Sequence, residues 1–250
     1  MPKGKDRMDD NLVTIEAKPA GISIETDKAA VVVVDMQNDF AAEGGMFRRA
    51  GIDTSTIRAA VAPIAKVLSA ARQSGIKIIY VKMAFEPDLP NAGSIDSVNR
   101  TRHLWFGVGQ TVAAPDGIDS RVLIRDTWNT DIVPELTPET DDIVIYKHRY
   151  SAFYDTEFDT ILKRLGIKYL IFTGCTTSVC VESTIRDAMF RDYLPVLLAD
   201  CTAEPIGLDF SRSNHEASLL LIERLFGWIS SSEEFIGALE SRPIAAAARS

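Results

Sequence analysis

Long apolar runs and an excess of positive charge are both missing from this sequence. No run reaches the roughly 18 apolar residues that a membrane-spanning helix needs, and no signal-peptide-like hydrophobic stretch follows the polar opening MPKGKDRMDD. The chain holds 27 Lys and Arg against 35 Asp and Glu, a formal net charge of -8, which works against binding to nucleic acid phosphates. We therefore expect a cytoplasmic protein that binds neither membrane nor nucleic acid.

Cysteine and histidine are scarce, with three residues of each among 250. Cys175, Cys180 and Cys201 are an odd number in a chain without a signal peptide, so reduced thiols are expected rather than a disulfide framework. The histidines lack the spacing of a metal site, and neither a glycine–lysine phosphate loop nor a G-x-S-x-G turn occurs. The sequence thus predicts no metal and disfavours an ATPase or a serine hydrolase.

Short β-branched runs alternate with longer helical patterns over most of the chain. Strands are expected at Ala29–Met36, Ile76–Met83, Asp142–Lys147, Tyr169–Thr173 and Pro195–Ala199. Helices are expected at Ile52–Ser74, Asp155–Leu165, Val179–Asp192, Phe210–Phe226 and Phe235–Leu239. Near-continuous apolar strands separated by helices predict a doubly wound α/β fold, a mainly parallel sheet with helices on both faces.

One domain is expected over residues 21–240, with a flexible lead-in over 1–20 and a flexible tail over 241–250. The exception to the alternation is Ala84–Pro134, which shows little regular pattern and is far longer than an ordinary loop. We expect it to form a wall of a pocket, since long loops commonly carry function, although a packed surface insertion is the alternative.

Polar residues close several of the predicted strands, where parallel sheets collect their ligands. Asp35 ends the run VVVV and is placed either to act as a base or to cap a turn. Lys147 ends DIVIYK, and it either reaches solvent or pairs with Asp35 in one crevice. The third such place is the stretch TGCTTSVC, Thr173 to Cys180, which links a strand to a helix.

Cys180 is the candidate nucleophile because it lies in the first turn of that helix. Free N–H groups and the positive helix end favour a thiolate there, so its pKa is expected to be lowered. Cys201 is expected to be an ordinary buried side chain and Cys175 to be structural. A thiol, a carboxylate, a cation and a turn of backbone donors together fit the hydrolysis of an amide bond.

Three of these stretches resemble motifs of the isochorismatase-like cysteine hydrolases, and the likeness extends over about Ile22 to Leu239. They are VVDMQNDF at Val33–Phe40, a lysine that closes a later strand, and a G-x-x-T-x-x-C-V turn at Gly174–Val181. Their order and context match the family. The nicotinamidase branch of the family carries a histidine and aspartate metal cluster after its second strand. The corresponding stretch here, Val81–Pro90, contains no histidine, so the resemblance does not extend to that branch or its metal.

The resemblance implies a catalytic triad of Asp35, Lys147 and Cys180 that works without a cofactor. It further implies a non-prolyl cis peptide bond between Cys175 and Thr176, with the backbone N–H groups of Thr176 and Cys180 forming an oxyanion hole. Members of the family are commonly oligomeric, so a homo-oligomer is expected.

Within the family, stretches such as CVESTIRD are most similar to the branch that cleaves the ureido group of ureidoacrylate in pyrimidine degradation. The reaction implied gives aminoacrylate, ammonia and carbon dioxide through a carbamoyl-enzyme. An arginine is the natural partner for a substrate carboxylate. The candidates for substrate binding are Asn38, Arg100, Arg102, Trp105, Arg149 and Tyr150.

Three alternatives stay open. One is the same chemistry on biuret or another N-carbamoyl or amide compound, and another is a non-catalytic binding member of the family. The third is a thiol redox protein, which the absence of C-x-x-C disfavours.

Overall fold

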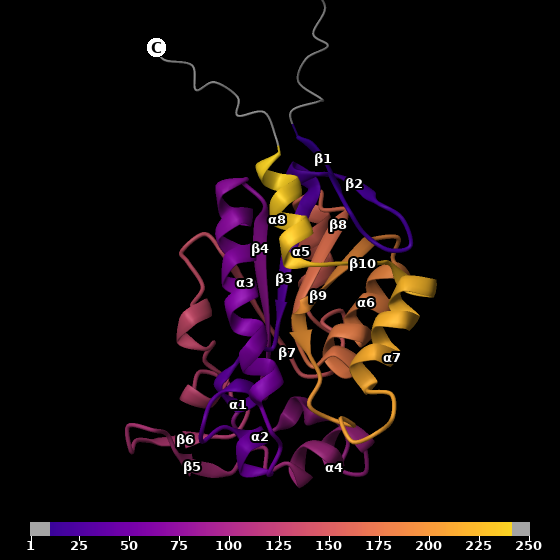
Figure 1. The fold of residues 1–250 in the computed structure, drawn as a ribbon. Helices are drawn as coiled ribbons and strands as arrows, with labels where there is room; N and C mark the ends of the chain where they lie inside the picture. The colour runs from indigo at the N-terminus through magenta and orange to yellow at the C-terminus, as the bar shows by residue number, and fades with distance from the viewer. Residues whose placement is uncertain (1–10, 242–250) are drawn as a thin grey trace, which may run out of the picture.

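The structure, a computed structural model, describes residues 11–241. Its centre is a six-stranded sheet in the order β10-β9-β8-β3-β4-β7, in which every neighbouring pair is parallel (Figure 1). The strands are β3 (Ala29–Val34), β4 (Lys77–Met83), β7 (Ile143–Lys147), β8 (Tyr169–Cys175), β9 (Leu194–Ala203) and β10 (Trp228–Ser230). Parallel strands place all their carboxyl ends at one edge, which is where the polar residues singled out above lie.

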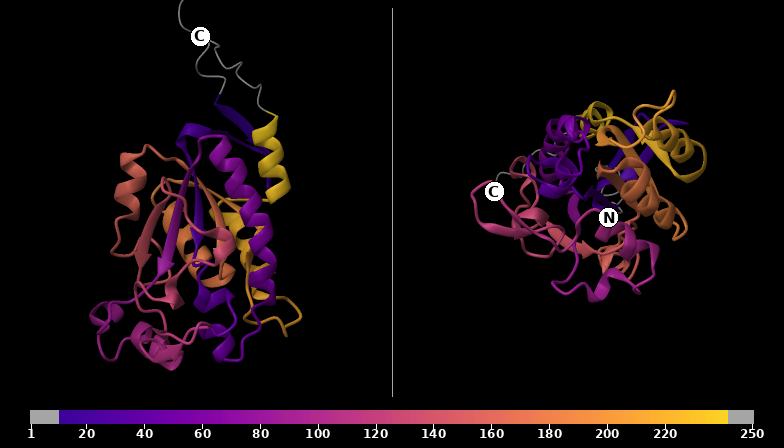
Figure 2. Two further views of the ribbon diagram at one scale, coloured as in Figure 1. Left: turned by 90° about the vertical axis from the view of Figure 1, so that its left-hand side faces the viewer. Right: turned by 90° about the horizontal axis from the view of Figure 1, so that it is seen from below.

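Helices cover both faces of the sheet (Figure 2). One face packs against α3 (Ser55–Gln73) and α8 (Ser232–Glu240), and the other against α5 (Phe158–Arg164), α6 (Glu182–Met189) and α7 (Asn214–Leu221). All six residues of β3 are buried, and they alternate between the two apolar cores because successive side chains of a strand point to opposite faces. The predicted doubly wound α/β fold is confirmed.

Within residues 11–241, no helix is both long and apolar enough to cross a membrane. The cytoplasmic location and the homo-oligomer stay predictions.

Two of the predicted helices have first turns that the apolar pattern does not indicate. The helix expected from Val179 starts as a π-helical turn, Thr177–Val181, and becomes α-helical only at α6. The helix expected from Phe210 begins at α7, because Ser213 and Glu216 form a reciprocal capping box that fixes its first turn. It then continues as a second π-helical turn, Ile222–Phe226.

Part of the expected lead-in is a strand, which corrects the prediction for residues 1–20. Leu12–Ile15 (β1) pairs antiparallel with Ile22–Glu25 (β2). Val13 and Ile15 alternate with exposed residues and are buried in the same core as α8, a period-two pattern typical of a half-buried strand. Residues 1–10 of the lead-in and 242–250 of the tail lie outside the described residues.

The long stretch Ala84–Pro134 contains short elements of its own: α4 (Val98–Trp105) and a hairpin of β5 (Thr111–Ala113) and β6 (Asp119–Arg121). Figure 1 shows these elements with α1 (Asn38–Ala41) and α2 (Met46–Arg49) at the end of the molecule toward which the sheet strands run. They therefore cover the carboxyl edge of the sheet.

Candidate active site

A fully buried ion pair lies at this edge. Asp35 directly follows β3 and Lys147 ends β7, on either side of β4 in the sheet. Lys147 Nζ donates to Asp35 Oδ2 at 2.7 Å, and the two side chains are 0% and 1% exposed. Two opposite charges are thus held in contact out of water, and of the two readings that the sequence left open for Lys147, pairing with Asp35 is the one observed.

Backbone and amide groups fix the Asp35 carboxylate in place. Asp35 takes a left-handed backbone conformation, with φ of 51°, which turns the chain out of β3. The Met83 N–H donates to Asp35 Oδ1 at 2.9 Å and to Gln37 Oε1 at 2.7 Å. Gln37 Nε2 donates in return to the Met83 carbonyl at 2.9 Å. Gln37 is a positioning residue that the sequence reasoning missed, although it lies within the motif at Val33–Phe40.

Gly174 lets the Cys180 turn come close to Asp35. Its φ is 108°, and a Cβ on this residue would lie 2.0 Å from the Val34 carbonyl oxygen, so only glycine fits between β8 and the end of β3. The Cys175–Thr176 peptide bond is cis, as the family resemblance implied. Cys175 is buried and its thiol donates to the Asp35 carbonyl at 3.3 Å, consistent with the structural role expected for it.

Two further contacts hold the π-helical turn that carries Cys180. The Glu204 carboxylate accepts from the backbone N–H of Ser178 at 3.0 Å and from its hydroxyl. Thr177 Oγ1 lies 3.0 Å from both Thr202 Oγ1 and His215 Nδ1. The partners come from the end of β9, the residue that follows it and α7, all more than 20 residues along the chain, so no local pattern identified them.

Cys180 and Asp35 line the same cavity, Lys147 pairs with Asp35, and both charges lie close enough to the Cys180 thiol to shift its pKa, so the structure brings the three predicted residues together. Burial raises the pKa of the Cys180 thiol, and the negative charge of Asp35 raises it further. The expectation that this pKa is lowered is therefore wrong for the resting site, because desolvation and a neighbouring carboxylate outweigh the opposing charge of Lys147.

The pKa values of Asp35 and Lys147 are both shifted by burial and by their contact with each other. Burial raises the pKa of the Asp35 carboxyl, and the contact with Lys147 opposes that rise. For Lys147, burial lowers the pKa, but Asp35 and Cys180 together outweigh it and the net shift is upward. The resting site therefore holds one cation, one carboxylate and one neutral thiol, and a thiolate forms when Asp35 takes its proton.

A cavity of about 110 Å³ opens beside these groups. Five predicted residues line it, Asp35, Thr176, Cys180, Arg102 and Tyr150, whereas Lys147 does not line it and pairs with Asp35. The sequence reasoning missed the other lining residues, namely Phe40, Met46, Phe47, Met83, His103, Phe106, Leu123, Val179 and Ile206. Several of them belong to Ala84–Pro134, so the prediction that this stretch forms a pocket wall is confirmed.

A protein-family model described as Isochorismatase domain matches residues 29–234. The chain belongs to the isochorismatase family. It is 39% identical over 233 residues to the ureidoacrylate amidohydrolase RutB of Methylorubrum extorquens, covering 92% of this chain and 90% of the relative. With RutB of Serratia proteamaculans the identity is 38% over 229 residues, covering 91% and 89% of the two chains.

Two solved structures agree with the fold. The crystal structure of a cysteine hydrolase from Pseudomonas syringae pv. phaseolicola matches with a TM-score of 0.73 at 30% identity, covering 88% of this chain and 96% of the other. N-carbamoylsarcosine amidase from Thermoplasma acidophilum matches with a TM-score of 0.61 at 26% identity, covering 82% and 97%. The predicted family is confirmed.

Four of the predicted substrate-binding residues do not line the cavity: Asn38, Arg100, Trp105 and Arg149. The side chains of the three polar ones donate hydrogen bonds to backbone carbonyls of neighbouring loops. Trp105 is 75% exposed and packs edge-on against the next residue. The structure thus separates these residues from Arg102 and Tyr150, which the same sequence argument proposed.

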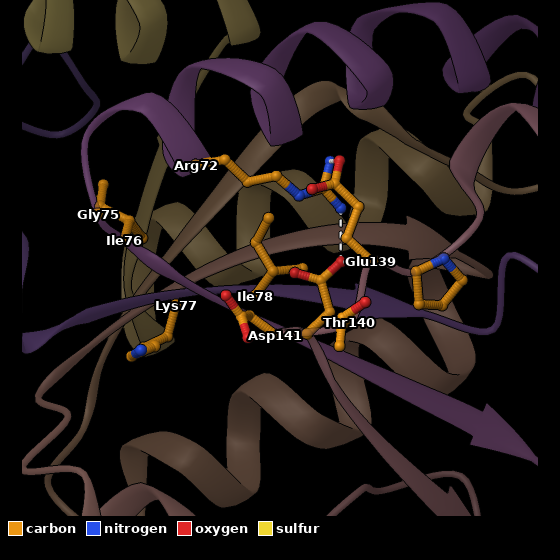
Figure 3. Close-up of a pocket in the computed structure, with 10 residues that line it drawn as sticks. Arg72, Gly75, Ile76, Lys77, Ile78, Glu139, Thr140 and Asp141 are labelled. Atoms are coloured by element: carbon orange, nitrogen blue, oxygen red, sulfur yellow. Dashed lines mark hydrogen bonds and ion pairs between the residues drawn. The ribbon is translucent and has the colours of Figure 1, made fainter.

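A larger cavity, of about 610 Å³, lies at the opposite edge of the sheet, where β4 and β7 begin (Figure 3). Its most prominent charged group, Arg72, is paired with Glu139 and Asp142. Ligands of parallel sheets bind at the carboxyl ends of the strands, so the smaller cavity beside Cys180 is the candidate active site. Within residues 11–241, no group of three or more His, Cys, Asp or Glu side chains is placed to share a metal ion.

Proposed function

We propose that this isochorismatase-family chain is a cysteine amidohydrolase that cleaves ureidoacrylate to aminoacrylate, ammonia and carbon dioxide. The observation that carries the proposal is the buried Asp35–Lys147 ion pair at a small cavity that Asp35 and Cys180 both line. The relatives named ureidoacrylate amidohydrolase support the choice of substrate, since they match this chain over about nine tenths of its length.

In the proposed mechanism, Asp35 takes the thiol proton of Cys180 as the sulfur attacks the carbamoyl carbon. Lys147 stays cationic and offsets the negative charge that passes from carboxylate to sulfur. The backbone N–H groups of Thr176 and Cys180 stabilise the oxyanion. The C–N bond to the acrylate then breaks, and aminoacrylate leaves with the proton returned from Asp35.

The second half of the reaction releases the carbamoyl group from Cys180. Asp35 removes a proton from a water molecule, whose oxygen attacks the carbamoyl carbon, and the thiolate leaves and is reprotonated. The carbamate set free decomposes to ammonia and carbon dioxide. Each half therefore uses the same carboxylate as base and then as acid.

Purified protein should release ammonia from ureidoacrylate and leave biuret largely unchanged, which a coupled ammonia assay measures. Biuret turnover without ureidoacrylate turnover would contradict the proposal. An N-carbamoyl amino acid is the second candidate substrate, because the N-carbamoylsarcosine amidase structure shares the fold at 26% identity.

The rate should fall in acid at a higher pH than an ordinary carboxyl would impose. Asp35 must be ionised to accept the proton, and burial raises its pKa above the usual value of about 3.9. Its active form is present above the raised pKa and is lost as pH falls through it. On the acid side of the pH profile, we expect kcat/KM to decline as a single group, Asp35, takes up one proton. Circular dichroism checks that the protein stays folded over the same range. A rate that stays constant down to about pH 4 would exclude Asp35 as the base.

A further inference from the structure

The charges around the cavity do not cancel. Asp35 is the sole carboxylate among the described residues that line it, and Lys147 neutralises it. Cys180 is a neutral thiol. His103 is 7% exposed and hydrogen-bonds through Nδ1 to the Asn99 carbonyl, and its burial lowers its pKa, which keeps the imidazole neutral. The remaining charge is the guanidinium of Arg102, so the lining carries one uncompensated positive charge.

Arg102 is also free to bind a ligand. Within residues 11–241, its guanidinium makes no hydrogen bond to another residue and lies within ion-pair distance of no carboxylate. The guanidinium of Arg100, on the same helix, donates to the Leu89 carbonyl, and that of Arg149 donates to two backbone carbonyls. The helix itself is fixed at its start, where Ser97 accepts from the Arg100 N–H. Arg102 is therefore presented from a rigid element with its donors unused.

The remaining walls strengthen the preference for an anion. Most of the side chains facing the cavity are apolar, including Phe40, Met46, Phe47, Phe106, Leu123 and Ile206. These walls offer an anion no other charged partner, so Arg102, which is itself exposed, is the one group of the lining that can pair with it. A cavity of about 110 Å³ is also small, which limits the ligand to a short molecule that reaches from Cys180 to Arg102.

We propose that Arg102 determines specificity by binding the carboxylate of the substrate, so that the enzyme accepts small monoanionic ureido acids and discriminates against neutral ureido compounds. The planar guanidinium offers two parallel N–H donors to the two carboxylate oxygens. The inference rests on the proposed function and adds the substrate class. It places biuret, which has no carboxylate, among the poor substrates.

The test compares ureidoacrylate with its neutral primary amide, which has the same length and the same ureido group. We expect Arg102→Met to lower kcat/KM for the acid roughly 10- to 100-fold, mainly through KM, because a charged hydrogen bond is lost. The same variant should change kcat/KM for the amide by less than about 3-fold. Arg102→Lys, which keeps the charge but not the paired donors, should be intermediate.

Arg100→Met is the matched control, since it removes an arginine of the same helix that lies outside the cavity. It should leave the acid-to-amide ratio of kcat/KM at the wild-type value. Equal losses for acid and amide in Arg102→Met, or an unchanged KM for the acid, would overturn the assignment.

A binding measurement separates this inference from the proposed function. Calorimetric titration of Cys180→Ser with the same two compounds reports affinity without turnover. Tighter binding of the acid, by about 10-fold or more, that disappears in Cys180→Ser/Arg102→Met supports Arg102 even if the wild type hydrolyses neither compound. Equal affinity for the two compounds, or no binding of the acid, would overturn it. Failure of the wild type to hydrolyse ureidoacrylate contradicts the proposed function alone.

Discussion

Cys180→Ala should lower kcat on ureidoacrylate by about 10³-fold or more, because the reaction loses the atom that forms the carbamoyl-enzyme. Cys180→Ser should be nearly as inactive. A hydroxyl holds its proton far more tightly than a thiol, and the Asp35 carboxylate is too weak a base to remove it. Ammonia release under saturating substrate measures both losses. Mass spectrometry of quenched wild-type enzyme should show the added mass of one carbamoyl group on the peptide that contains Cys180.

Cys201→Ala is the control for this prediction. Cys201 is fully buried in β9 but does not line the cavity, so its loss should leave kcat near the wild-type value. Retained turnover in Cys180→Ala, or a carbamoyl group found on Cys175, would assign the nucleophile elsewhere. If Cys180→Ala changes no measured rate while substrate binding is intact, a non-catalytic member of the family is favoured.

The parts of the site that the sequence predicts are those that end a strand. Asp35 and Lys147 each close a buried apolar run, and the parallel topology then brings such ends to one edge. The position of Cys180 after a strand and at the start of a helix could be inferred for the same reason. The sign of its pKa shift could not be, because that sign depends on the sum of burial, Asp35 and Lys147, which only the folded arrangement defines.

The walls of the cavity were beyond sequence reasoning because their contacts are long-range. Asp39 accepts from the backbone N–H of Met46 at 2.9 Å and from that of Leu123 at 2.7 Å. It thereby joins two residues of the cavity lining, although Leu123 lies 84 residues after Asp39 in the chain. Burial raises the pKa of this carboxyl to about 6. The motif contains Asp39, but no periodic pattern indicates its partners. Likewise, three arginines were equivalent in sequence, and only the structure places Arg102 on the cavity.

Lys147→Met should abolish activity and also lower the free energy of unfolding at pH 7 by about 3–5 kcal/mol. The substitution leaves the Asp35 carboxylate buried, 1% exposed, without its counter-charge. Asp35 must then stay charged in an apolar setting or take up a proton, and either state costs free energy relative to the unfolded chain. Urea denaturation followed by circular dichroism measures the loss.

The loss of unfolding free energy in Lys147→Met should depend on pH. Without Lys147, the pKa of Asp35 in the folded state is raised further above its unfolded value, so the folded form binds the proton more tightly. The protonated carboxyl is tolerated below the unfolded pKa of about 3.9, and stability is lost as pH rises through the raised folded pKa. The difference between Lys147→Met and wild type should therefore be largest near neutral pH and should shrink in acid.

The double variant Asp35→Asn/Lys147→Met separates stability from catalysis. Because both charges are removed together, no uncompensated ion is buried, and most of the lost unfolding free energy should return. Activity should stay absent, since the base that accepts the Cys180 proton has gone. A stable and active Lys147→Met variant would show that the buried pair neither holds Asp35 ionised nor supports the thiolate. A double variant as unstable as the single one would mean that the packing of Lys147, rather than its charge, stabilises this edge of the sheet.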